Sequence, residues 1–132
     1  MSEARQFIHS VKEALNDIDE QMRNHPFPDF LSERKASPDS LRAFPGHLYH
    51  VVSSDLRSFS MLVSRFGDGP SRDLFIGMLE GERDSLDRLL SMARKLGMTE
   101  DDLMGYEVTA KGFARATFMA HQALTAREKM KR

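Results

Sequence analysis

Hydrophobic and polar residues alternate along this chain with the period of an α-helix. In the first segment the apolar side chains recur every three or four positions: Phe7, Ile8, Val11, Ala14, Leu15, Ile18 and Met22. This spacing places them in one stripe along a helix. The pattern predicts a helix over residues 1–24 that ends close to Asn24, because Pro26 disfavours the α conformation at the residue before it.

A short segment with two prolines, Pro26 and Pro28, follows this helix. Each proline fixes its own φ angle and lacks a backbone donor, so we expect an extended and stiff linker. Phe27, Phe30 and Leu31 are then expected to pack this linker against the core.

A second stripe runs through residues 37–66 and includes one charged residue: Leu41, Phe44, Leu48, Val51, Val52, Asp55, Phe59, Leu62 and Val63. Ser37 and Pro38 suit the N-cap and the first helical position. Pro45 lies inside the pattern beside Gly46, which predicts a helix that is kinked or split there.

Three further helices follow from the pattern, over residues 70–96, 99–105 and 109–129. Gly97 suits the position just after a helix, and Thr99 with Asp102 resembles a capping box. No segment shows the alternation of a strand more clearly than a helical period. The sequence therefore predicts one all-α domain over residues 1–132, a helical bundle of four to five helices.

Composition narrows the function classes. The formal net charge of −1 gives no electrostatic reason to expect nucleic acid or a membrane as partner. The chain has no cysteine, which excludes disulfides, thiolate catalysis and cysteine-ligated zinc, and fits a cytoplasmic protein. No apolar run approaches the roughly 18 residues that a membrane span requires.

Glu82 is the clearest candidate for chemistry, because it interrupts the apolar stripe of residues 70–96. It lies three residues after Leu79 and four before Leu86. A carboxylate on a buried face must be paired, protonated or bound to a metal. The alternatives to an acid–base group or ligand are a salt bridge to an arginine on a neighbouring helix, or simple exposure.

Three histidines also lie near apolar stripes: His47, His50 and His121. Glu82 with His47 is the candidate catalytic pair, and Glu82, His47 and His121 are the candidate metal ligands. Bundles build iron sites from carboxylates and histidines that project inward from different helices. The alternative for each histidine is a hydrogen-bonded imidazole with a purely structural role.

Two tyrosines, Tyr49 and Tyr106, join His50 and His121 as candidate substrate-binding residues. A tyrosine can orient a ligand, but it is more often a core aromatic with its hydroxyl at the edge. Asp55 also interrupts an apolar stripe. It is a candidate partner for Arg57, Arg65 or an arginine across the bundle.

Several short motifs together resemble the TenA/PqqC-like group of the haem-oxygenase-like fold. The quoted motifs are His25-Pro26-Phe27, Leu31, Ser37 to Phe44, Tyr49-His50, Ser64 to Asp68, Gly81-Glu82 and Leu96 to Met98. The resemblance covers roughly residues 24–123. It implies the N-terminal part of the haem-oxygenase-like fold, with the last two helices of that fold absent.

This group includes thiaminase-type hydrolases, a cofactor-free oxidase and non-haem iron oxygenases. The resemblance implies an oxidase or oxygenase acting on a small organic molecule, with non-haem iron or no cofactor, and no haem. Thiaminase-type members carry an aspartate and a tyrosine where we align His47 and His50, and they use a cysteine that this chain lacks. Iron-dependent members resemble the chain at Glu82 but carry a histidine a few residues later, where Ser85 and Leu89 stand here.

The absent helices leave three readings: a fragment, a natural short form, or a chain that has lost the family active site. A half-fold exposes apolar helix faces, so we expect a homodimer. Two functions follow as hypotheses. One is an oxidase or oxygenase with Glu82 and the histidines around a pocket. The other is a non-catalytic helical dimer or small-molecule-binding module.

Overall fold

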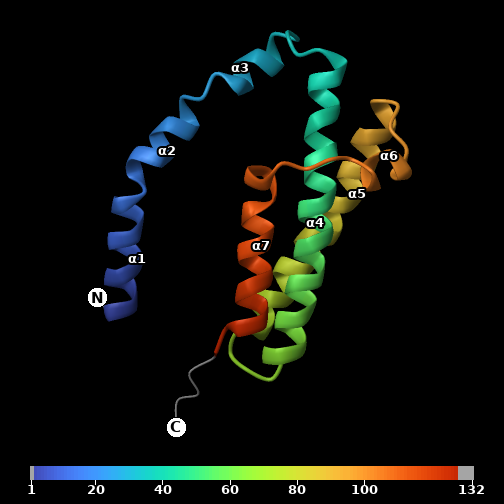
Figure 1. Cartoon of the computed structure of the whole chain (residues 1–132). Helices are drawn as coiled ribbons and strands as arrows, with labels where there is room; N and C mark the ends of the chain where they lie inside the picture. Colours follow the sequence, from blue (N-terminus) through green and yellow to red (C-terminus); the bar gives the residue numbers. More distant parts are fainter. Residues whose placement is uncertain (1, 128–132) are drawn as a thin grey trace. The chain divides into compact units, whose positions relative to one another are not determined.

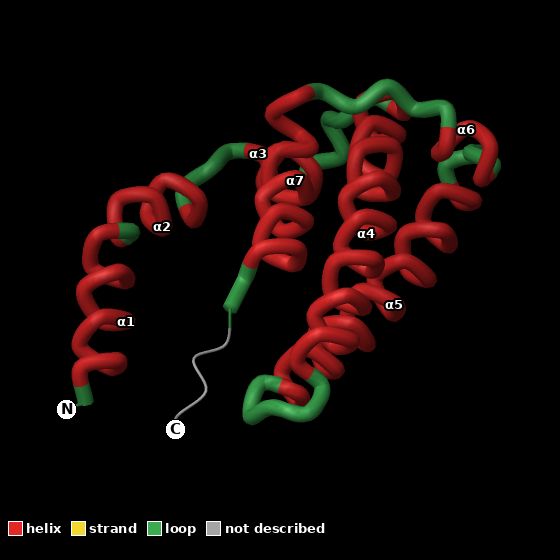
Figure 2. Tube along the Cα trace, turned by 60° about the horizontal axis from the view of Figure 1, so that its bottom comes forward, coloured by secondary structure: helices red, strands yellow, loops and turns green. Residues whose placement is uncertain are grey.

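The computed structural model describes residues 2–127, and every regular element in that range is a helix (Figures 1 and 2). One domain is expected from the sequence, whereas the structure divides the chain into two compact units, Met1–Ala36 and Ser37–Arg132.

The first unit contains α1 (Glu3–Ala14), α2 (Asn16–Arg23) and α3 (Phe27–Ser32). The single helix expected over residues 1–24 is interrupted at Leu15, which ends α1 and precedes α2. Asn16 and Asp17 follow directly, and their short polar side chains compete with the helical backbone and favour helix starts.

Helix α3 replaces the extended linker that the two prolines predict. Pro26 is its N-cap and Pro28 lies in its first turn, where the missing N–H has no intrahelical partner in any helix. The prolines therefore begin a helix here rather than prevent one. Phe27, Phe30 and Leu31 are between 38% and 43% exposed in this unit.

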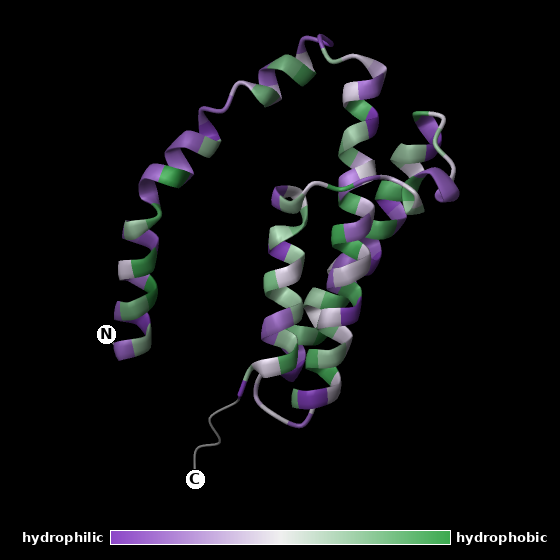
Figure 3. Cartoon of the chain, viewed as in Figure 1, coloured by the Kyte–Doolittle hydropathy of each residue, from purple (hydrophilic) through white to green (hydrophobic). Residues whose placement is uncertain are grey.

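The apolar stripe of α1 and α2 is exposed along its length. Phe7 is 68% exposed, Ile18 53% and Met22 69%, and no described residue of α1, α2 or α3 is buried. Figure 3 shows hydrophobic residues along one side of α1 and hydrophilic ones along the other. Helices this short are marginal in water unless an apolar face packs on something.

The second unit is built around α4 (Pro38–Phe66). Helices α5 (Arg72–Lys95), α6 (Glu100–Met104) and α7 (Ala110–Thr125) all pack on α4 (Figure 1). Two apolar clusters hold these helices together, one centred on Val52, Leu89, Ala93, Met98 and Leu103, the other on Phe59, Leu62 and Ala123.

Helix α4 continues through Pro45 without interruption, so the split that this proline could cause does not occur. Pro45 is buried, as is Gly46 beside it. Burial at this point of the helix therefore compensates for the backbone hydrogen bond that a proline removes.

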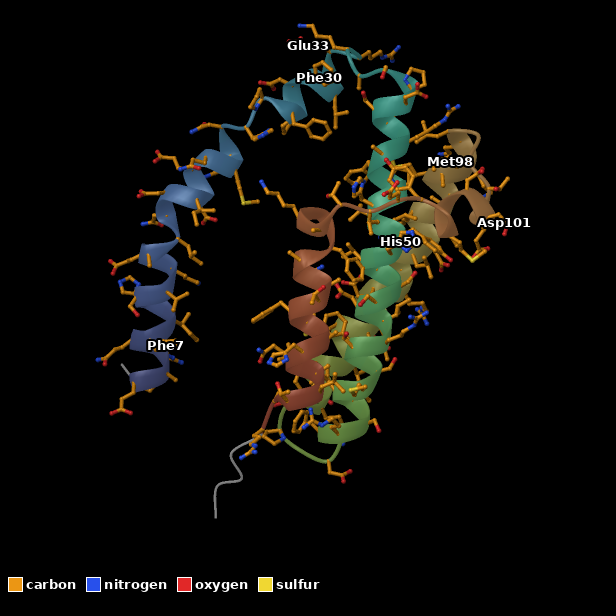
Figure 4. All side chains as sticks on the ribbon, viewed as in Figure 1. Phe7, Phe30, Glu33, His50, Met98 and Asp101 are labelled. Atoms are coloured by element: carbon orange, nitrogen blue, oxygen red, sulfur yellow. The ribbon has the colours of Figure 1, made fainter. Side chains whose placement is uncertain are left out.

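The predicted capping residues Ser37, Gly97 and Thr99 are confirmed. The Ser37 side chain accepts a hydrogen bond from the Ser40 amide, and Thr99 with Asp102 forms the capping box of α6. Gly97 has a φ of 73° after α5, and the next amide, that of Met98, donates to the Ala93 carbonyl over 2.9 Å. Met98, labelled in Figure 4, is thereby buried against the end of α5.

Helix α7 ends at Thr125, earlier than the expected residue 129, and residues 128 and 129 lie outside the described part. The Arg65 guanidinium of α4 donates to the carbonyl oxygens of Ala123 and Ala126. It thereby caps free carbonyls at the end of α7. Within residues 2–127 no helix has both the length and the apolarity that crossing a bilayer requires.

Candidate functional site

A pocket of about 370 Å³ lies where α4, α5 and α7 meet. Its walls are mainly apolar: Phe44, Leu48, Val51, Val52, Leu89 and Met92. Three charged side chains also line it, namely Glu82, Arg88 and Arg115. Volume and lining both fall within the range of small-molecule sites, which are largely apolar with a few polar groups.

Arg115 of α7 connects the charged groups of three helices. Its Nη1 donates to Oδ2 of Asp55 on α4 over 2.7 Å, and its Nη2 lies 3.9 Å from Oε1 of Glu82 on α5. The Asp55 side chain is fully buried, while that of Glu82 is 17% exposed. Among the partners considered for Asp55, the arginine across the bundle is the one observed.

Arg115 makes its short contact with Asp55, while Glu82 lies farther from the guanidinium. The attraction to Arg115 therefore offsets only a small part of the cost of burying the Glu82 carboxylate. Burial raises the pKa of the Glu82 carboxyl above its ordinary value, and the nearby Asp55 carboxylate raises it further. Arg115 acts in the opposite direction but is the smallest of the three causes. Glu82 is therefore a carboxyl group that holds a proton more readily than an exposed glutamate.

Both ring nitrogens of His47 make hydrogen bonds. Its Nδ1 lies 3.0 Å from the Ala43 carbonyl oxygen, and its Nε2 accepts from the Thr109 amide over 3.4 Å. A proton on Nδ1 satisfies both bonds, and the second bond ties the start of α7 to α4. His47 is thus a hydrogen-bonded imidazole outside the pocket that Glu82 lines.

Tyr106 packs edge-on against His47, with ring centroids 5.2 Å apart. Its ring also lies against Gly46, where an added Cβ would come within 2.5 Å of the tyrosine ring. The absence of a side chain at residue 46 is what allows the contact. Tyr106 therefore closes the core beside α6, and it does not line the Glu82 pocket.

Tyr49 and His50 face a different pocket from that of Glu82. At about 100° per residue, Leu48, Val51 and Val52 lie on one side of α4, and Tyr49, His50 and Ser53 lie on roughly the opposite side. The expected grouping of His47, His50 and Glu82 around one cavity is consequently wrong.

His121 is exposed on α7, contrary to the expectation that it lies on the apolar side. The metal site expected from Glu82, His47 and His121 is not assembled either. Within residues 2–127 no three histidine, aspartate or glutamate side chains lie close enough together to hold a metal ion. Glu82 instead faces the cationic Arg115, so this donor set does not fit non-haem iron.

The second unit is an all-α bundle with Glu82 beside the apolar residues where α4, α5 and α7 meet. The model of the TENA/THI-4/PQQC family, a family of haem-oxygenase-like fold, matches residues 12–127, and the chain belongs to this family. No match was found among curated proteins or among solved structures.

Arg115 is the site residue that the sequence pattern did not single out. It lies among small and apolar residues in the segment Phe113-Ala114-Arg115-Ala116, yet its side chain is 61% exposed. The sequence feature that pointed to such a cation was Asp55, because it interrupts an apolar stripe. A buried carboxylate requires a cation on a neighbouring helix, but periodicity does not say which one.

Replacing Arg115 with methionine tests the ion pair. We expect Arg115→Met to lower the free energy of unfolding by about 3 kcal/mol, because it leaves Asp55 buried and unpaired. Urea denaturation measures the change. Arg83→Met is the matched control, since Arg83 is exposed and its ion pair within residues 2–127 is with the exposed Asp84; it is expected to cost less than about 0.5 kcal/mol.

The double variant Asp55→Leu/Arg115→Met completes this test. It removes both charges, so we expect it to regain most of the stability lost in Arg115→Met. Equal losses in Arg115→Met and Arg83→Met would show that Asp55 does not depend on Arg115.

The raised pKa of Glu82 predicts a pH-dependent stability. The folded state binds the Glu82 proton more tightly than the unfolded state. The resulting stabilisation is complete below the ordinary pKa near 4.5 and is lost as the pH rises through the folded-state value. We therefore expect Glu82→Gln to gain stability relative to the native chain between pH 4 and pH 7. A pH series of urea midpoints measures this, and a difference that stays constant across the series contradicts it.

Proposed function

We propose that the chain binds a small, mainly apolar molecule in the pocket beside Glu82. The observation that carries the proposal is a poorly compensated carboxyl group at the wall of an apolar cavity between three helices. Natural ligand sites combine such walls with a few polar groups that orient the ligand. Membership of the family also favours a small organic ligand, as the resemblance in the sequence implies.

The polar groups of this pocket define the ligand more closely. Glu82 accepts a hydrogen bond when ionised, so it suits a hydroxyl or amine hydrogen of the ligand. Arg88 and Arg115 donate, and they suit a carbonyl or other oxygen. A flat ring with a hydroxyl group and an oxygen acceptor matches this set, with Phe44 and Met92 against its faces.

A second candidate is an enzyme that removes two electrons and two protons from this molecule and passes them to dioxygen, which is reduced to hydrogen peroxide. The observation that favours it is the raised pKa of Glu82, because a carboxylate of higher pKa is a stronger base for removing a ligand proton. In this version Glu82 is the catalytic residue. His47 takes no part, since both of its ring nitrogens are already bonded.

The binding proposal is tested with 2-naphthol, a flat ring with one weakly acidic hydroxyl. Methionine methyl groups labelled with ¹³C report on the site, since Met92 lines this pocket. We expect the Met92 methyl resonance to shift in a saturable way. Glu82→Gln is expected to weaken binding about tenfold, the usual loss for one hydrogen bond to a charged group.

Glu80→Gln is the matched control for that experiment, because Glu80 is exposed on the same helix and does not line the pocket. Its affinity for 2-naphthol is expected to equal that of the native chain. A Met92 resonance that does not move at saturating probe, or equal losses in both variants, would contradict the proposal. The second candidate is tested by oxygen uptake. A ligand that the native chain oxidises should cause dioxygen to be consumed by Glu80→Gln but not by Glu82→Gln.

We also propose that two copies associate through the exposed stripe of α1 and α2. Phe7, Ile18 and Met22 share this stripe and are more than half exposed. A self-complementary apolar face is the usual basis of a two-fold dimer. Helix α2 has three acidic residues, Asp17, Asp19 and Glu20, and one basic residue, Arg23. An antiparallel pairing keeps the two acidic α2 helices apart.

Sedimentation equilibrium tests the dimer. We expect the native chain to have twice the mass of one chain, and Phe7→Glu to shift it to the monomer, because it places a charge in the paired stripe. Gln6→Glu adds the same charge to the neighbouring residue, on the polar side of α1, and is expected to remain dimeric. A native chain that sediments as a monomer at all concentrations refutes this part of the proposal.

A further inference from the structure

We propose that a second pocket, on the opposite side of α4 from Glu82, binds a small organic oxyanion with an apolar body. The pocket has a volume of about 310 Å³ and lies between α4, the end of α6 and the start of α7. Carboxylates and phosphate monoesters share the chemistry that this pocket recognises. The inference does not depend on the function proposed for the Glu82 pocket.

Four hydrogen-bond donors follow one face of α4 toward this pocket: His50, Ser53, Ser54 and Arg57. Their spacing of three, four and seven residues from His50 places them on a single side of the helix. Successive turns of α4 therefore each contribute a hydrogen-bond donor to this pocket.

These donors are not used by the rest of the described structure. The His50 Nε2 atom is buried and has no hydrogen-bond partner among residues 2–127 (His50 is labelled in Figure 4). In the same range, no hydrogen bond or ion pair engages the side chain of Ser53, Ser54 or Arg57. A buried polar atom without a partner costs free energy, and a ligand atom that bonds to it recovers that cost.

The charges of the lining favour an anion. Arg57 is the cation of the pocket, and no carboxylate lines it within the described residues. Tyr49, which also lines the pocket, gives its hydroxyl hydrogen to Glu100 over 3.4 Å and so is not a free donor. A guanidinium fork beside serine hydroxyls is the usual way in which proteins hold carboxylate or phosphate oxygens.

The far wall of the pocket is apolar. Phe113 of α7 contributes a ring and Met104 of α6 a thioether. A thioether adapts to the shape of its neighbour, and both groups pack well on a flat ring. The pocket therefore suits an anion attached to a ring rather than a bare inorganic ion.

The two pockets each contain one methionine, which allows them to be distinguished in one experiment. Met104 lines this pocket, and Met92 lines the Glu82 pocket. We would label the methionine methyl groups with ¹³C, assign these two resonances with Met104→Leu and Met92→Leu, and titrate with phenyl phosphate and benzoate. Benzyl alcohol serves as the uncharged probe.

We expect phenyl phosphate, benzoate or both to shift the Met104 resonance in a saturable way without moving that of Met92. The tighter of the two probes identifies the phosphate or the carboxylate as the preferred oxyanion. Benzyl alcohol is expected to leave the Met104 resonance unchanged. Arg57→Gln is expected to weaken anion binding by about tenfold, the loss typical of a charged hydrogen bond.

Arg83→Gln is the control for Arg57→Gln, because it removes an exposed arginine from α5 that lines neither pocket. Its affinity for the anions is expected to be unchanged. The inference is overturned if neither anion shifts Met104, if Arg57→Gln binds as tightly as Arg83→Gln, or if Met92 responds in place of Met104. A negative result here leaves the response of Met92 to 2-naphthol as a separate test of the first site.

Discussion

The ion pair between Arg115 and Asp55 is the constraint on which the second unit depends. Asp55 is fully buried in the central helix, and an isolated carboxylate cannot be held there without a cation or a proton. Arg115 supplies the cation from α7 and thereby joins the middle of α7 to α4. The same arginine reaches Glu82 of α5 only at 3.9 Å. One exposed guanidinium group thus joins three helices and leaves the Glu82 carboxyl partly uncompensated.

The two sides of α4 line two different pockets. On one side, apolar residues and Glu82 line an open pocket that favours an apolar molecule with a hydrogen to donate. On the other side, a row of donors from His50 to Arg57 favours an anion. His47 belongs to neither set, because it bonds the start of α7 to α4. Histidines that look equivalent in the sequence therefore have different surroundings, because His47 and His50 lie on different sides of α4.

Local chemistry in the sequence predicted the helix ends well. Ser37, Gly97 and the Thr99–Asp102 box act within one turn of the chain, so no distant contact can overrule them. Pro45 and Pro28 were harder to predict, because burial carries α4 through the first proline and the second falls in the first turn of α3. The site shows the same limit. Periodicity placed Glu82 on an inner face, but only the packing of three helices shows that Arg115 faces it and that His121 does not.

The central claim is that Glu82 is a poorly compensated carboxyl group at the wall of a ligand pocket. The most direct measurement is an NMR titration of its side-chain carboxyl carbon, with ¹³C-labelled glutamate and assignment from Glu82→Gln. The structure predicts a pKa above the ordinary value near 4.5, because burial and Asp55 together outweigh Arg115. A pKa at or below that value would mean that Arg115 pairs fully with Glu82, and it would contradict the account.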